Sequence, residues 1–346
     1  MTQPSAKPLI WSQGDRTLLG EGERLRIDPG IGPRRYQRAL NALRESGNDM
    51  AFASFTFDTM ATGSVVIVPE RLTETSQELD TTPFDYSRPS GIIESDGICS
   101  WRKGFRRVLD AIDQGTLEKV VLTRQIELRF EAEPSSTDVA FRLKDTQTGC
   151  YIFAVDGLVG ASPELLVSLR NGVVSSLVLA GTAPTAESLG SAKMDLEHVL
   201  AASSVHKELA RHVITLDAPR RSVLEFGEIK HLATRFEGPV ANGFTVLDVM
   251  RALHPTPSVA GTPTEASLNL IREIEPLSRG RYAGPVGWFD SDGEGEFAIA
   301  LRCGLLDGER VTLYAGGGLV DGSDESSEHA ETELKLSPML RALGLK

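Results

Sequence analysis

The sequence predicts an α+β fold built on large antiparallel sheets. Short apolar runs rich in β-branched residues recur along the chain, and several of them alternate apolar with polar residues as half-buried strands do. These runs arrive in clusters, and helical patterns stand between the clusters rather than after every strand. Clustered strands favour an α+β architecture over a doubly wound parallel sheet.

The predicted elements follow one another in a mixed order. Strand-like runs occupy residues 50–57, 63–70, 119–130, 150–170, 173–181, 296–306 and 310–317. Helical patterns occupy residues 34–46, 101–115, 135–149, 194–216, 244–253 and 264–274, and a further helix is expected over 326–336. The stretch "TPTE" at 262–265 predicts a capping box with Thr262 as N-cap and Glu265 reaching back to it.

Length and composition bound the domain organisation. The chain has 346 residues, of which 40% are hydrophobic and 24% charged, so it is long enough to bury a large core. We expect a single domain over residues 1–346. Within it, residues 1–97 form an N-terminal portion of the same fold and residues 98–346 carry the chemical motifs. The loop at 80–97 is the best candidate for a linker.

Charge and cysteine usage exclude several classes of protein. The formal net charge of -12 argues against nucleic acid or an anionic membrane surface as a partner, and an anionic ligand would need local cations. The three cysteines are far apart and lack metal-type spacing, which favours a reducing compartment. The N-terminus does not resemble a signal peptide, and no apolar run approaches the ~18 residues of a membrane span. We therefore expect a cytoplasmic protein.

Carboxylates and an ammonium share one face of the predicted C-terminal helix. In "SSEHAETELKL", Glu328, Glu331 and Lys335 lie close together around an axis that turns ~100° per residue. Glu197 lies on another predicted helix, in "KMDLEHVL". Histidines next to these glutamates suggest zinc, but adjacent helical residues point ~100° apart and cannot both face one ion. Carboxylates alone suit Mg²⁺, although a solvated surface position is the more common explanation for any lone glutamate.

Three other side chains stand where chemistry could occur. Lys119 is the first residue of a predicted strand. It is either an ordinary exposed lysine or a base whose aliphatic stem is buried and whose pKa is lowered. Glu164 follows a Ser-Pro turn that could hold its carboxyl rigidly, and Arg302 lies on a strand where a guanidinium needs a partner. The glycine-containing loops at 177–185 and 314–323 are either tight turns or sites of close approach to an anion. The proline-rich loop at 253–263 is extended and rigid.

The order of these motifs resembles one known superfamily. The series "KVVLTR", "GASPELL", "LAGTAP", "KMDLEH", "HLATRFEG", "LHPTPSVAGTP", "RGRYAGPVG", "IALRCG", "YAGGGLVDGS" and "SSEHAETELKL" is similar to the chorismate-utilising enzymes, and most of all to isochorismate synthases. The resemblance covers roughly residues 100–346. It implies the fold of chorismate-binding enzymes and anthranilate synthase component I, a single large domain of two stacked antiparallel β-sheets flanked by helices.

The resemblance also implies a role for each candidate residue. It implies a Mg²⁺ ion held by Glu197 and Glu331, with Glu328 bound through water. Lys119 would activate the water that attacks C2 of chorismate, and a protonated Glu164 would donate to the departing C4 hydroxyl. The residues implied to bind or surround the substrate are Gly181, Thr182, His231, Ser258, Tyr282, Arg302, Gly316 and Lys335.

Within the superfamily, single residues favour one reaction. Anthranilate synthases typically carry glutamine at the Lys119 position, and aminodeoxychorismate synthases use a lysine where Ala180 stands here, so no ammonia chemistry or glutaminase subunit is expected. Salicylate synthase is the alternative, because it shares the lysine. Relatives that release pyruvate tend to carry threonine where Ser258 stands, which favours isochorismate synthase, but isochorismate synthases commonly have alanine there, so the hydroxyl of Ser258 leaves some pyruvate release open. A non-catalytic chorismate-binding paralogue is the other alternative, although Lys119 and Glu164 are both present. A monomer is expected, and menaquinone and siderophore pathways both stay open.

Overall fold

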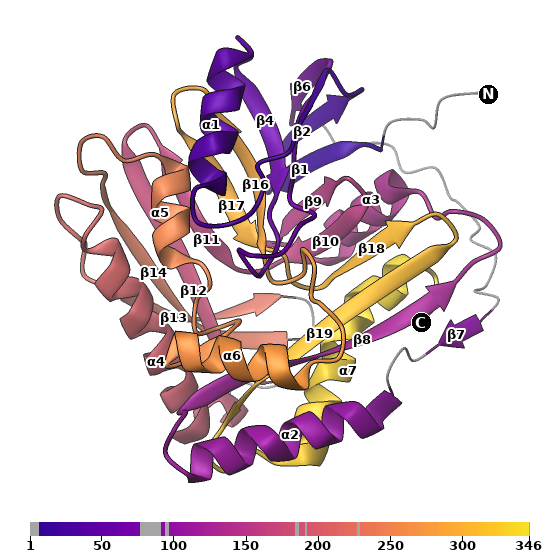
Figure 1. Ribbon diagram of the computed structural model, residues 1–346, viewed down its shortest axis with the longest axis vertical. Coiled ribbons are helices and arrows are strands. Elements are labelled where there is room, and N and C mark those ends of the chain that lie inside the picture. The colour runs from indigo at the N-terminus through magenta and orange to yellow at the C-terminus, as the bar shows by residue number, and fades with distance from the viewer. Residues whose placement is uncertain are drawn as a thin grey trace.

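The computed structural model describes residues 7–76, 91–93, 97–183, 187–190, 192–226 and 229–345. The side chains of residues 91–93, 97–99, 182–183, 187–188, 192–193 and 229 lie outside this description, as does most of the candidate linker at 80–97. The described chain forms two large sheets in which the paired strands run antiparallel, with helices packed against them (Figure 1). The predicted fold class, two stacked antiparallel sheets flanked by helices, is confirmed.

The first sheet has ten strands and gathers both ends of the chain. Nine of its strands follow the order β15-β8-β19-β18-β10-β9-β1-β2-β6, and β7 pairs with β8. Its strands are β1 (Leu9–Gln13), β2 (Arg16–Glu21), β6 (Arg71–Thr75), β7 (Gly91–Ile93), β8 (Lys119–Arg129), β9 (Tyr151–Val155), β10 (Leu158–Ser162), β15 (Gly261–Thr262), β18 (Cys303–Asp307) and β19 (Arg310–Val320).

The second sheet has nine strands in the order β13-β14-β12-β11-β17-β16-β4-β5-β3. Its strands are β3 (Leu25–Ile27), β4 (Met50–Ser54), β5 (Val65–Val68), β11 (Leu165–Arg170), β12 (Val173–Ala183), β13 (Arg220–Phe226), β14 (Ile229–Pro239), β16 (Pro285–Asp290) and β17 (Gly295–Ile299). Contacts of β4 and β16 with β9 join the two sheets. One cluster of buried apolar side chains extends across both of them.

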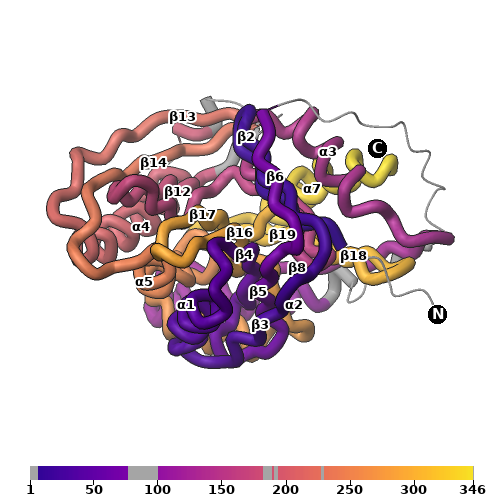
Figure 2. Tube along the Cα trace, turned by 90° about the horizontal axis from the view of Figure 1, so that it is seen from above, coloured from indigo at the N-terminus to yellow at the C-terminus, as the bar shows by residue number. Residues whose placement is uncertain are grey.

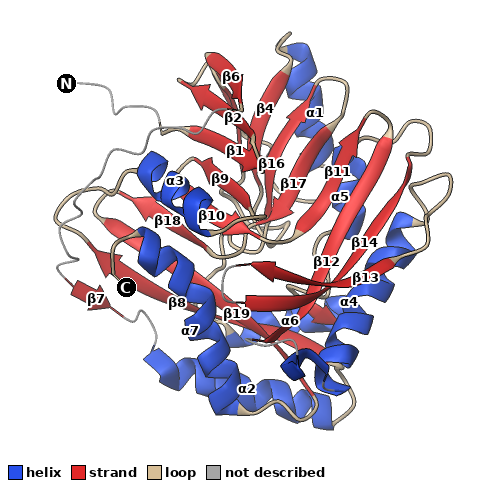
Figure 3. Ribbon diagram, turned by 180° about the vertical axis from the view of Figure 1, so that it is seen from behind, coloured by secondary structure: helices blue, strands red, loops and turns tan. Residues whose placement is uncertain are grey.

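Helices cover the outer faces of the sheets. They are α1 (Arg35–Glu45), α2 (Gly97–Asp113), α3 (Ser136–Thr146), α4 (Ala192–Leu209), α5 (Val246–Leu253), α6 (Thr264–Ile274) and α7 (Glu325–Ala342), with a short 3-10 helix at Glu187–Gly190. Helices α2, α3 and α7 contact the ten-stranded sheet, whereas α4 and α5 contact the nine-stranded sheet (Figures 2 and 3). No helix in the described residues is long and apolar enough to cross a membrane.

Local sequence explains why the helices begin and pack where they do. In α1, the buried Tyr36, Leu40 and Leu43 follow helical spacing and present one apolar face to the core. Helix α5 starts with a complete capping box between Thr245 and Asp248. The capping box expected at Thr262 is wrong, because Thr262 belongs to β15 and α6 begins after Pro263 without a side-chain cap.

Two continuous apolar runs each pass from one sheet to the other. Residues 150–170 form β9 and β10 in the ten-stranded sheet and then β11 in the nine-stranded sheet, while 296–306 form β17 and then β18. The two crossing points are bonded to each other, since Ala161 N–H donates to the carbonyl of Arg302 and Ile299 N–H donates to the carbonyl of Glu164, each at 3.2 Å. Glu164 and Arg302 therefore lie together where the sheets meet.

Candidate active site

A cavity opens where the two sheets cross. The empty space in and above it, open solvent included, is about 690 Å³. Eight of the residues singled out from the sequence line it, and they come from strands, crossings and helices far apart in the chain: Glu164, Glu197, His231, Ser258, Tyr282, Arg302, Gly316 and Lys335. The fold thus brings together side chains that the sequence separates by more than a hundred positions.

Lys119 is not among the residues that line this cavity, but it is bonded to one that is. It is the first residue of β8, and its side chain is fully buried. Its ammonium donates to Oε1 of Glu197 at 2.9 Å, and Glu197 itself lines the cavity from α4. A fully buried lysine needs such a partner, because burying an unpaired charge is costly. Of the two alternatives for Lys119, the exposed surface lysine is therefore wrong.

Glu164 is a buried acid with a strongly perturbed titration. Only 3% of the residue is exposed. Burial raises the pKa of its carboxyl from 4.5 to about 7, although a hydrogen bond from Ser258 and the positive charges of Lys119 and Lys335 act in the opposite direction. The carboxyl is therefore partly protonated at neutral pH, which suits a proton donor.

Arg302 and His231 form a buried pair on the cavity wall. Arg302 has a positive φ of 45°, and its Nη2 lies 2.7 Å from Nε2 of His231. Burial and then the charges of Arg302 and Lys335 hold the pKa of His231 well below its usual range, so the imidazole is neutral and accepts from the guanidinium. Nη1 of Arg302 is buried without a hydrogen-bond partner among the described residues, which leaves one donor for a ligand.

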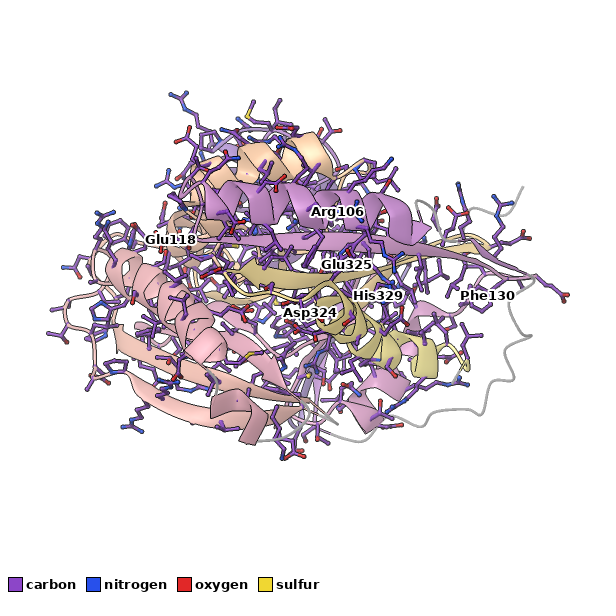
Figure 4. The ribbon with its side chains drawn as sticks, turned by 90° about the horizontal axis from the view of Figure 1, so that it is seen from below. Arg106, Glu118, Phe130, Asp324, Glu325 and His329 are labelled. Atoms are coloured by element: carbon purple, nitrogen blue, oxygen red, sulfur yellow. The ribbon has the colours of Figure 1, made fainter. Side chains whose placement is uncertain are left out.

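The carboxylates of α7 surround Lys335. Asp324 caps this helix by accepting from the backbone N–H of Ser327 (Figure 4 labels Asp324 and Glu325 at its start). Lys335 donates to Oε1 of Glu331 at 2.6 Å and to the carbonyl of Gly316 at 2.9 Å. Burial alone would lower the pKa of this ammonium, but the charges of Glu331, Glu197 and Glu328 outweigh it and raise the pKa above its ordinary value.

The glycine run of β19 allows two of these carboxylates to approach the strand. A Cβ at Gly318 would lie 2.4 Å from Oε1 of Glu197 and 2.8 Å from Cε of Lys119. A Cβ at Gly317 would lie 3.3 Å from Oε2 of the buried Glu328, whose other oxygen, Oε1, accepts from Ser323. Only glycine at 318 leaves room for the Lys119–Glu197 pair.

The carboxylates around Lys335 have the donor chemistry of a metal site. Hard carboxylate oxygens are the donors that Mg²⁺ prefers. The negative charges of Glu197, Glu328 and Glu331 all raise the pKa of the same ammonium, that of Lys335. Across the described residues, no three His, Cys, Asp or Glu side chains already stand at metal-binding spacing. The donor chemistry fits Mg²⁺, while lysines now neutralise two of the carboxylates.

The histidines beside two of these glutamates point elsewhere. Nε2 of His198 lies 2.7 Å from Oγ1 of Thr234 in the nine-stranded sheet. His329 contacts the guanidinium of Arg124 and the ring of Trp101, and it is labelled on α7 in Figure 4. Each histidine therefore has its contacts away from the glutamate beside it, as expected for adjacent helical residues.

Not every candidate residue reaches the cavity. Gly181 lies in β12 at a register irregularity with φ of 76°, and it is not among the lining residues. The backbone of Thr182 pairs with His231, but its side chain lies outside the described residues. Glu328 and Glu331 are likewise not among the lining residues and lie near the cavity through Lys335.

Among the polar side chains that line the cavity, sequence reasoning missed two. Arg279 is 3% exposed, pairs with Glu275 at 2.6 Å, and donates to the carbonyls of Val121 and Val259. The i,i+4 spacing of Glu275 and Arg279 could have indicated this pair. Tyr314 stacks on Tyr282 with ring centroids 5.1 Å apart, and no local pattern in the sequence indicates that contact.

Comparison with known proteins identifies the family. A family model described as "Chorismate binding enzyme" matches residues 40–344. The chain belongs to the chorismate-binding enzyme family. Its relatives include the isochorismate synthase MenF of Bacillus subtilis, 36% identical over 70% of this chain but only 55% of that protein, and the isochorismate synthase DhbC of the same organism, 37% identical over 71% of this chain and 68% of that one.

A solved structure extends the likeness to the whole chain. The crystal structure of a putative 2,3-dihydroxybenzoate-specific isochorismate synthase, DhbC from Bacillus anthracis, superimposes with a TM-score of 0.87 at 29% identity. The superposition covers 100% of this chorismate-binding enzyme and 98% of that chain. The likeness therefore includes the N-terminal portion, where the sequence motifs were sparse.

Proposed function

We propose that this enzyme converts chorismate to isochorismate by adding water at C2 of the ring while the C4 hydroxyl leaves. The observation that carries the proposal is the partly protonated carboxyl of Glu164 on the cavity wall, together with the fully buried amine of Lys119, which is bonded to the lining residue Glu197 and whose charge acts on Glu164. Relatives that bear the name isochorismate synthase support the choice of reaction.

The two groups divide the proton transfers between them. Lys119 in its neutral form removes a proton from the attacking water, so it must first lose the proton that it shares with Glu197. Glu164 donates its proton to the departing C4 hydroxyl, a role that suits a carboxyl with a pKa of about 7. Both groups are fixed by the fold, Lys119 at the start of a strand and Glu164 at a sheet crossing.

Local cations would hold the anionic substrate. Arg302 offers its unpaired Nη1 to the enolpyruvyl carboxylate, and the neutral His231 keeps the guanidinium in place by accepting from Nη2. Lys335 and the backbone at Gly316 complete this subsite. Tyr282 and Ser258 form the surrounding wall in this proposal.

A magnesium ion is part of the proposal. Glu197 and Glu331 would hold it, with Glu328 acting through water, and the donor chemistry described above supports this choice. When bound, such an ion supplies a positive charge that fixes the ring carboxylate and withdraws charge from the ring.

The proposal has a direct test. Purified protein incubated with chorismate and Mg²⁺ should give isochorismate by liquid chromatography, with only traces of salicylate and pyruvate. Salicylate as the main product at neutral pH would favour the salicylate synthase alternative. Binding of chorismate without turnover would favour the non-catalytic paralogue.

We also propose that the enzyme works as a cytoplasmic monomer without a glutaminase subunit, as the sequence predicts. Sedimentation at micromolar concentration and turnover without glutamine or ammonia would test the monomer and the absence of a glutaminase.

A further inference from the structure

Two hydroxyls stand in line behind the carboxyl of Glu164. Oγ of Ser258 donates to Oε1 of Glu164 at 2.8 Å, and Oγ1 of Thr256 lies 2.6 Å from Oγ of Ser258. Thr256 and Glu164 are both nearly fully buried, and Ser258 is partly buried. Water therefore has little access to this side of the carboxyl.

The chain of hydroxyls has a defined direction. A serine hydroxyl carries one proton, so the proton given to Glu164 leaves only the lone pairs of Ser258 for its neighbour. Thr256 must then donate to Ser258. The backbone holds this donor in place, because the N–H groups of Val259 and Ala260 both donate to the carbonyl of Thr256, at 3.1 and 3.0 Å.

We propose that Ser258, held by Thr256, is a positioning residue for the proton donor of the reaction. Its hydroxyl fixes one carboxyl oxygen and stabilises the ionised form that Glu164 must reach when it gives up its proton. A hydrogen bond to an ionised group is stronger than one to a neutral group, so the contact tightens as the proton leaves. This inference rests on the proposed function, in which Glu164 is that donor.

Groups other than the Ser258 hydroxyl also shift the pKa of Glu164. Burial opposes ionisation, while Lys119 from β8, Lys335 from α7 and the backbone N–H of Leu179 in β12 favour it. The titratable and charged side chains that line the same cavity are Glu197, His231, Arg279, Tyr282, Arg302, Tyr314 and Lys335. All of these stay in place when the Ser258 hydroxyl is removed, so a difference between the two proteins reports on that hydroxyl.

The test is the pH profile of chorismate consumption by the wild type and by Ser258→Ala. Without the hydroxyl the donor becomes a weaker acid, so the alkaline limb should move up by about one pH unit while the maximal kcat falls severalfold, by at most about tenfold. A purely structural defect would lower the rate without moving that limb upward. Ser258→Thr, which restores a hydroxyl, should return the limb to its wild-type position.

A second variant protects the test against misfolding. Thr256→Val removes the donor behind Ser258 with little change in shape, and its alkaline limb should move upward by less than that of Ser258→Ala. If the wild type is active but the alkaline limb of the pH profile stays in place or moves down in both variants, the inference about Ser258 is overturned while the proposed function stands. A wild type that makes no isochorismate would instead overturn the proposed function.

Discussion

Replacement of Glu164 by glutamine should change the pH dependence of stability by a predictable amount. Burial raises the pKa of this carboxyl from 4.5 to about 7. Between those values the folded protein binds a proton that the unfolded chain releases, so wild-type stability falls as pH rises through this window and levels off above it. At about 1.4 kcal/mol per pKa unit, the loss amounts to about 3 kcal/mol. The glutamine amide does not titrate, so the variant does not lose this stability as pH rises.

Urea unfolding without ligand, at about pH 5 and about pH 8, measures this effect. The free energy of unfolding of Glu164→Gln minus that of the wild type should rise by most of that ~3 kcal/mol between the two pH values. Titration of every other group is common to both proteins and cancels, as does any pH-independent cost of the amide. A difference that stays constant with pH would refute the assignment of a buried, protonation-sensitive carboxyl to Glu164.

Three further substitutions test the remaining parts of the site. Lys119→Ala should abolish water addition while calorimetry still detects chorismate binding, and wild-type turnover would remove the assigned base. Glu331→Gln should shift the Mg²⁺ dependence of turnover to higher concentration; an unchanged titration would argue against this carboxylate as a ligand. Gly318→Ala places a methyl 2.4 Å from Oε1 of Glu197 and should lower activity at least tenfold. The matched control, Gly190→Ala, meets no atom of the described residues within 4 Å and should retain activity.

The sequence was informative about the kind of fold and less so about how its strands are distributed. The short apolar, β-rich runs at 63–70 and 119–130 became β5 and β8. The long runs at 150–170 and 296–306 gave no sign that each would divide between two sheets, because both sheets bury apolar side chains alike. The helix predicted over 194–216 ends at Leu209, and the chain then leads into β13.

The candidate site depended on resemblance more than on local pattern. Lys119 and Glu164 were individually ambiguous, because burial and ion pairing arise only when distant segments pack together. Thr256 and Arg279 escaped notice for the same reason, since their partners lie in other elements or depend on the folded loop. The expected cap at Thr262 failed because that residue pairs with Lys119 in a short strand instead of starting a helix.

Incorporation of labelled oxygen tests the central claim most directly. Chorismate and Mg²⁺ would be incubated with the enzyme in water enriched in ¹⁸O. The product would then be isolated and its mass measured by mass spectrometry. Addition of solvent at C2 predicts isochorismate that carries one heavy oxygen at that carbon. Isochorismate without the label, or a product other than isochorismate, would contradict the account.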